Sequence, residues 1–90
     1  MKLKYIKYYD ALGQILRAYR EAQTDMKQEQ LAEKLGVKQS YISKIEKGNV
    51  RLGFIETREY CEALGYPFDE LLNAVEARVP KQTPLKWWSH

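Results

Sequence analysis

The side chains best suited to binding chemistry lie in one stretch, QEQLAEKLGVKQSYISKIEKG, which covers residues 28–48. Within it, Gln39, Ser40, Ser43 and Lys44 recur at spacings that place them on one face of a short helix. Amide, hydroxyl and ammonium groups can read base edges in the major groove, where Gln pairs with adenine, Lys with guanine and Ser with either. On an isolated amphipathic helix the same composition would indicate an ordinary solvated face. The surroundings of this helix therefore decide between the two interpretations.

The basic charge of the chain is concentrated around that helix. The formal net charge is only +3, but residues 34–51 hold five basic residues and one acidic residue. Residues 52–78, in contrast, hold two basic and six acidic residues. A polyanion would be attracted to the first segment and repelled by the second. We therefore expect double-stranded DNA as the partner of the face that contains residues 34–51.

The chain offers little for catalysis, metal binding or membrane insertion. Cys61 is the only cysteine and the terminal His90 is the only histidine, so a disulfide within the chain and a Cys/His metal site are both excluded. Ser40 and Ser43 have no histidine in the body of the chain to activate them, and no phosphate loop or nucleophile elbow occurs. We expect no enzyme activity and no cofactor, and we expect Cys61 to be a small core residue. The absence of a membrane-spanning run and of a secretory signal predicts a cytoplasmic protein.

The apolar spacing predicts an all-α fold, a compact bundle of about five short helices. The first helix is expected from an N-cap at Asp10 to about residue 23, and the second and third over residues 28–35 and 39–47. The fourth helix is expected over residues 54–64 and is marked by Phe54, Ile55, Cys61 and Leu64. The fifth is expected over residues 67–78 and is marked by Phe68, Leu71, Leu72 and Val75. Lys27 is a poor N-cap for the second helix, so either Thr24 or Asp25 caps it or its start is ragged.

The second and third helices meet the requirements of a helix-turn-helix motif. Two helices that cross closely need a small residue at the crossing, which Ala32 supplies, and a turn residue that tolerates positive φ, which Gly36 supplies. Ile42 is the β-branched wedge between the two helices. The remaining core-facing positions are Leu31, Leu35, Val37 and Ile45, and Val37 is expected to anchor the turn in the core.

With this motif in place, the chain resembles the Cro and phage-repressor type of helix-turn-helix proteins, the XRE-like regulators. The resemblance rests on LGQILRAYR, on residues 28–48 and on the ALG…DELL ending of the last two helices, and it covers roughly residues 11–75. It implies a lambda-repressor-like bundle whose third helix enters the major groove. The base-reading side chains would then be Gln39, Ser40, Ser43 and Lys44. The phosphate-contacting side chains would be Gln28, Lys38, Tyr41, Lys47, Asn49 and Arg51.

The resemblance also implies a buried structural ion pair between Arg20 and Glu46. The chain departs from the family pattern in a longer EAQTDMK loop, in Lys27 at the cap, and in Thr57 and Arg58, which stand where apolar residues are common. These departures affect the edges of the domain and the dimer face more than the DNA-reading face.

We expect three regions along the chain: residues 1–10 as an aromatic and basic arm or as the start of the first helix, residues 11–78 as the DNA-binding domain, and residues 79–90 as a tail. Tyr5, Tyr8 and Tyr9 would pack at the helix start or read DNA as an arm. Trp87 and Trp88 would dock on the domain or on a second subunit, or would stack on bases.

The function indicated by these features is a sequence-specific transcriptional regulator, a repressor or autoregulator that binds palindromic sites as a homodimer. The alternative is a protein-interaction module on the same frame, similar to an antitoxin, that binds a partner protein through the last two helices or the tails.

Overall fold

A computed structural model describes the backbone of residues 3–79 and the side chains of residues 7–79. In this range the chain forms five helices: α1 (Leu3–Gln23), α2 (Gln28–Leu35), α3 (Gln39–Glu46), α4 (Phe54–Leu64) and α5 (Phe68–Arg78). The all-α fold expected from the apolar spacing is confirmed. Trp87 and Trp88, for which docking or stacking was expected, lie outside the described residues.

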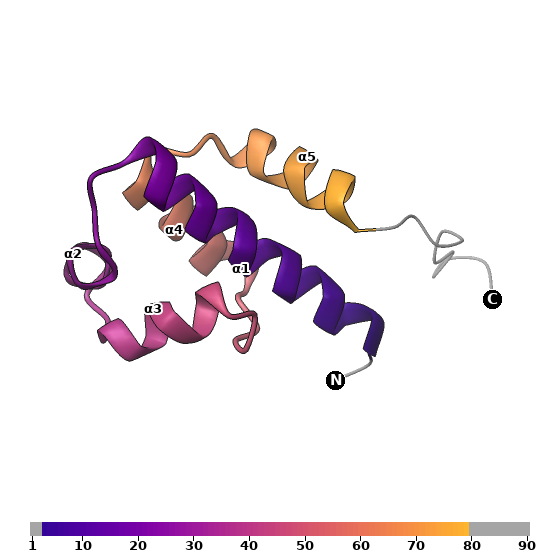
Figure 1. Cartoon of the computed structure of the whole chain (residues 1–90), viewed down its shortest axis with the longest axis horizontal. Coiled ribbons are helices and arrows are strands. Elements are labelled where there is room, and N and C mark those ends of the chain that lie inside the picture. Colours follow the sequence, from indigo (N-terminus) through magenta and orange to yellow (C-terminus); the bar gives the residue numbers. More distant parts are fainter. Residues whose placement is uncertain (1–2, 80–90) are drawn as a thin grey trace.

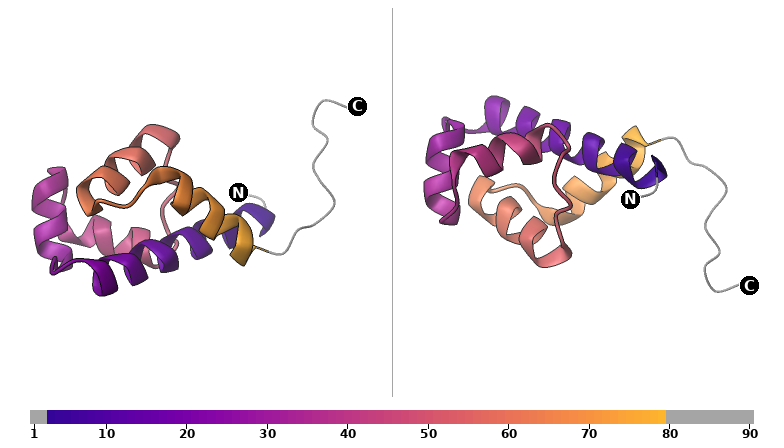
Figure 2. Two further views of the ribbon diagram at one scale, coloured as in Figure 1. Left: turned by 90° about the horizontal axis from the view of Figure 1, so that it is seen from above. Right: turned by 90° about the horizontal axis from the view of Figure 1, so that it is seen from below.

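The helices form a bundle around α1, the longest of them. Figure 1 shows α1 between α3 and α5, and α4 closes the bundle by packing against α2 and α5 (Figure 2). Each helix contributes at least one fully buried side chain to the centre of the core. These side chains are Leu16, Leu31, Ile42, Tyr60, Cys61 and Leu71. Because every helix is anchored in the same core, the position of α3 relative to the rest of the domain is fixed.

The turn between α2 and α3 has the predicted geometry but not the predicted anchor. Gly36 adopts the left-handed conformation with φ 71°, and Ala32 and Ile42 are buried where the two helices cross. The side chain of Val37, however, is 38% exposed, so the prediction that it anchors the turn in the core was wrong. The backbone holds the turn instead, since the N–H of Val37 donates to the carbonyl oxygen of Ala32 over 2.9 Å.

The start of α1 also differs from the prediction. The helix begins at Leu3, so Asp10 lies inside it and is not its N-cap. The carboxylate of Asp10 accepts a hydrogen bond from the Gln14 amide, one turn along the helix, at 3.3 Å. Residues 3–9 contain no glycine or proline that would stop the helix, and an internal aspartate on the exposed side is tolerated. For residues 3–10, the backbone is therefore the start of α1 and not an extended arm.

The junction between α1 and α2 is capped in an unexpected way. The hydroxyl of Thr24 donates to the carbonyl oxygen of Arg20 at 2.7 Å and accepts from the N–H of Met26 at 3.1 Å. Thr24 thus closes the end of α1, and neither it nor Asp25 caps α2. The N-cap of α2 is Lys27, whose own N–H donates to the side-chain oxygen of Gln30 at 2.8 Å. The ammonium group of Lys27 cannot accept a hydrogen bond from the first N–H groups of α2. Lys27 is tolerated as the N-cap because the Gln30 side chain accepts from its N–H, which is one of the two hydrogen bonds of a capping box.

The first turn of α4, which Phe54 and Ile55 mark in the sequence, faces outward. These two side chains are 62% and 61% exposed. The inner face is formed by Tyr60, Cys61 and Leu64, together with Thr57. Thr57 can be buried because its hydroxyl donates to the carbonyl oxygen of Gly53 at 2.7 Å, which satisfies the polar atom. Leu72 of α5 is also largely exposed, although it had been assigned to the apolar stripe.

Cys61 is expected to be unreactive in the folded protein. Its thiol is buried, and burial raises its pKa from 9.0 to about 11, whereas the reactive form is the thiolate. Because folding raises this pKa, the thiol stabilises the fold below pH 9.0, and that contribution is lost as the pH rises through about 11. We expect a disulfide reagent at pH 8 to label native protein far more slowly than urea-unfolded protein. Equal labelling rates for native and unfolded protein would contradict the burial of the Cys61 thiol.

Candidate nucleic-acid interface

Helix α3 presents the predicted base-reading side chains along its outer face. Ile42 and Ile45 are buried and hold the helix against α1 and α2. Gln39, Ser40 and Lys44 are exposed, and Ser43 is half-buried. The polar face and the apolar face of α3 are therefore separated as a groove-binding helix requires.

A chain of polar contacts runs from the core to the first residue of α3. Arg20 donates to both carboxylate oxygens of Glu46, from Nε to Oε2 at 2.7 Å and from Nη2 to Oε1 at 3.1 Å. Both residues are buried, and Arg20 also donates from Nη1 to the carbonyl oxygen of Met26 at 3.1 Å. The hydrogen bond to Glu46 raises the pKa of the guanidinium, so this group is charged at every pH at which the protein folds. The pair joins α1 to the end of α3 across the core.

Gln28, at the start of α2, continues this chain outward. Its amide nitrogen donates to Oε1 of Glu46 at 2.8 Å, and its amide oxygen accepts from Nε2 of Gln39 at 3.4 Å. Because a carboxylate can only accept hydrogen bonds, the amide nitrogen of Gln28 must face Glu46, and its oxygen is then directed to Gln39. The orientation of the first residue of α3 is thus linked to the buried ion pair. Gln28, assigned to a phosphate contact, already has two partners within the protein.

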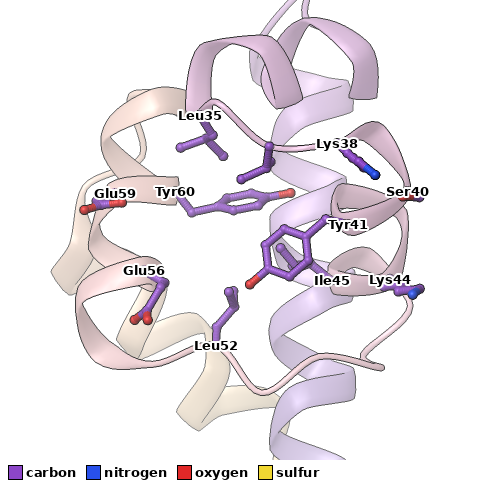
Figure 3. Close-up of a pocket in the computed structure, with 11 residues that line it drawn as sticks. Leu35, Lys38, Ser40, Tyr41, Lys44, Ile45, Leu52, Glu56, Glu59 and Tyr60 are labelled. Carbon is purple, nitrogen blue, oxygen red and sulfur yellow. The ribbon is translucent and has the colours of Figure 1, made fainter.

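The predicted phosphate contacts are placed at both ends of α3. Lys38 is the residue before the helix and Lys47 the residue after it, and both are exposed. Asn49 and Arg51 are exposed in the loop to α4, and the N–H of Asn49 donates to the carbonyl oxygen of Lys44 at 2.9 Å. Tyr41 points elsewhere: it is half-buried and lines a groove between α3 and α4 (Figure 3). Four of the assigned side chains therefore flank the outer face of α3, and Tyr41 is partly removed from it.

Two glycines, Gly13 and Gly48, position this interface, and Gly13 was not singled out by the sequence analysis. Gly13 lies where α1 crosses the end of α3, and a Cβ there would overlap the carbonyl oxygen of Ile45. Gly48 has φ 79°, and a Cβ there would lie 2.6 Å from the Cα of Asp10. These contacts bring the end of α3 and the following loop directly against α1. A glycine inside an otherwise helical pattern, as at Gly13, is the signal that could have indicated such a close approach.

Comparison with known proteins agrees with this arrangement. A helix-turn-helix family model matches residues 16–71. The solved structure of the clp gene regulator ClgR from C. glutamicum is similar, with 26% sequence identity, a TM-score of 0.74, and coverage of 80% of this chain and 91% of that chain. A comparison with curated protein sequences finds no significant match. Within residues 3–79, no cluster of His, Cys, Asp and Glu could hold a metal ion, and no helix has the length and apolar character needed to cross a membrane.

The fold and the outer face of α3 define a helix-turn-helix DNA-binding domain. The chain belongs to the Cro/C1-type, XRE-like helix-turn-helix family of DNA-binding transcriptional regulators.

Proposed function

We propose that this protein is a repressor or autoregulator that reads palindromic DNA in the cytoplasm as a homodimer, with α3 of each copy in the major groove. The observation that carries this proposal is the outer face of α3. There Gln39, Ser40 and Lys44 are exposed while the opposite face is locked into the core. Basic side chains at both ends of the helix would neutralise phosphates and set its register on the duplex.

Selection of bound sequences from random duplex DNA tests this function. We expect an enriched half-site that recurs in inverted orientation, with centres about one helical turn apart, roughly 34–36 Å. Affinity should also fall steeply as the salt concentration rises, because phosphate contacts release counterions. If no half-site is enriched and affinity does not depend on salt, the regulator function is contradicted.

Substitutions at Gln39 and Lys47 are expected to separate base reading from phosphate contact. Gln39→Ala should relax specificity at one base position and cost roughly 1–3 kcal/mol on the preferred site. Lys47→Ala should weaken binding to all sequences alike and reduce the slope of log affinity against log salt by about 1. Fluorescence anisotropy on the selected site and on single-base variants measures both effects. If the two variants lose affinity in the same pattern, the assignment of roles is wrong.

The homodimer is proposed to form through an aromatic patch made of Phe54, Arg58, Phe68 and Leu72. The ring of Phe54 meets that of Phe68 edge to face, with centroids 5.3 Å apart, and the guanidinium of Arg58 lies 5.8 Å from the Phe68 ring. Phe54 and Leu72 are largely exposed. Exposed apolar side chains that cluster in this way are typical of protein–protein contacts. Arg58 would pair with a carboxylate of the second copy.

Phe54→Ser is expected to convert the dimer into a monomer without unfolding it, since the side chain is 62% exposed in the single chain. Sedimentation equilibrium of the wild type and the variant measures the change. Tyr8→Ser, which removes an exposed aromatic ring from α1, is the matched control and should leave the dimer intact. A Phe54→Ser protein that remains dimeric would place the dimer face elsewhere.

A further inference from the structure

A groove of about 580 Å³ lies between α3 and α4, and its α4 wall has no part in the DNA-reading function. Figure 3 shows Tyr60 extending across it from α4 toward α3, with the ring of Tyr41 beside it. Leu35, Ile45 and Leu52 complete its apolar lining. A volume of this size lies within the range, roughly 300–1,000 Å³, of pockets that hold small molecules.

The two rims of the groove carry opposite charge. Lys38 and Lys44 line it on the α3 side, and Glu56 and Glu59 line it on the α4 side. Within residues 7–79, none of these four side chains forms an ion pair. Opposite charges that face each other across an apolar groove without pairing can be bridged by a molecule that carries both signs.

The floor of the groove is closed by Tyr60, which is only 1% exposed. Its hydroxyl is enclosed by the protein, so a molecule in the groove does not reach that oxygen. Tyr41, the ring beside Tyr60 at the α3 wall, is only half-buried and can yield to a bound group.

We propose that this groove binds a small aromatic molecule that carries a carboxylate at one end and an ammonium group at the other. Its ring packs against Tyr41, its carboxylate pairs with Lys38 and Lys44, and its ammonium group pairs with Glu56 and Glu59. Under the proposed DNA-reading function, on which this step rests, the same two lysines face DNA. The ligand and DNA then compete for them, so binding of the small molecule weakens DNA binding.

NMR titration of the DNA-free full chain tests the binding separately from DNA recognition. The probe is 4-(aminomethyl)benzoate, with benzoate and benzylamine as controls that each carry one of the two charges. We expect saturable amide shifts that are confined to residues 35–60. The bipolar probe should bind about fivefold more tightly than either control, because it alone forms exposed ion pairs at both of its ends. Absence of saturable shifts at these residues, or equal affinity for all three compounds, would overturn the proposal. Groove shifts that follow protein concentration without any probe would also overturn it, because the occupant would then be a second copy.

Glu59→Gln provides the matched variant, since Glu59 lines the groove but lies outside the DNA-reading face. This variant should bind the selected DNA site as the wild type does and should lose the preference for the bipolar probe over benzoate. In the wild type, the probe should weaken DNA binding, measured by anisotropy, and in Glu59→Gln this effect should be about fivefold smaller. An unchanged preference in Glu59→Gln would contradict the ligand orientation. The NMR titration contains no DNA, so failure of specific DNA binding would contradict the proposed function without changing the result for ligand binding.

Discussion

Replacing Glu46 by leucine is expected to lower the free energy of unfolding by about 3–5 kcal/mol. Glu46 and Arg20 form the buried ion pair of the domain, with side chains that are only 2% and 10% exposed. Without the carboxylate, the guanidinium stays buried and loses two of its three hydrogen bonds, keeping only the one to the carbonyl oxygen of Met26. The cost is therefore that of an unpaired buried charge, not merely that of a lost contact. Urea unfolding followed by circular dichroism measures the difference.

The double variant Arg20→Met/Glu46→Leu is the control for this prediction. It removes both charges, and because desolvation of the pair offsets most of its attraction, the double variant should recover most of the stability that the single variant loses. It should not recover DNA specificity. Gln28 would lose its acceptor on Glu46 and with it the constraint that directs its oxygen to Gln39. Equal stability of the single and double variants would contradict the cost assigned to the unpaired Arg20 charge. Wild-type DNA specificity in the double variant would show that Gln39 does not need the hydrogen bond to the oriented Gln28 amide.

The helix-turn-helix frame could be predicted because it depends on residue types at fixed local offsets. Ala32 and Ile42 meet the steric requirements of the helix crossing and Gly36 those of the turn, and their burial and φ angle agree with the prediction. The outer residues of α3 followed from the same register. Their DNA contacts stay predictions, since no DNA is present.

Other features depend on contacts between distant segments, which a pattern in one segment does not reveal. Phe54 and Ile55 mark α4 in the sequence together with Cys61 and Leu64, but α4 enters the bundle only from Thr57 onward, so its first turn remains exposed. The partners of Gln28 are also distant, since Glu46 lies 18 positions further along the chain. The sequence suggested a phosphate contact there, whereas the structure adds a link from the ion pair to Gln39.

The N-cap of α1 was misplaced for a different reason. A favourable cap residue such as Asp10 indicates where a helix could begin, but nothing in residues 3–9 prevents the helix from extending further. Capping preference is worth only about 1 kcal/mol, so it does not end a helix that can continue.

Gly13→Ala is expected to destabilise the domain by about 3 kcal/mol, the reverse of what helix propensity predicts. In the middle of an exposed helix, alanine is favoured over glycine by roughly 1 kcal/mol. At Gly13 the added Cβ would overlap the carbonyl oxygen of Ile45 and lie 2.9 Å from that of Glu46. Both obstacles are backbone atoms of α3, so no side chain can move aside, and α1 must separate from α3 near the ion pair.

Ala18→Gly is the matched control for Gly13→Ala, because Ala18 is exposed on the same helix. It should cost only the propensity difference, about 1 kcal/mol, and leave DNA binding unchanged. Gly13→Ala should cost more stability and should also weaken binding to the selected site, since the end of α3 must shift with the crossing. Urea unfolding and anisotropy on both variants provide the comparison. A Gly13→Ala protein as stable as the wild type would mean that α1 and α3 can separate freely, and the close crossing would then not be what positions the DNA-reading helix.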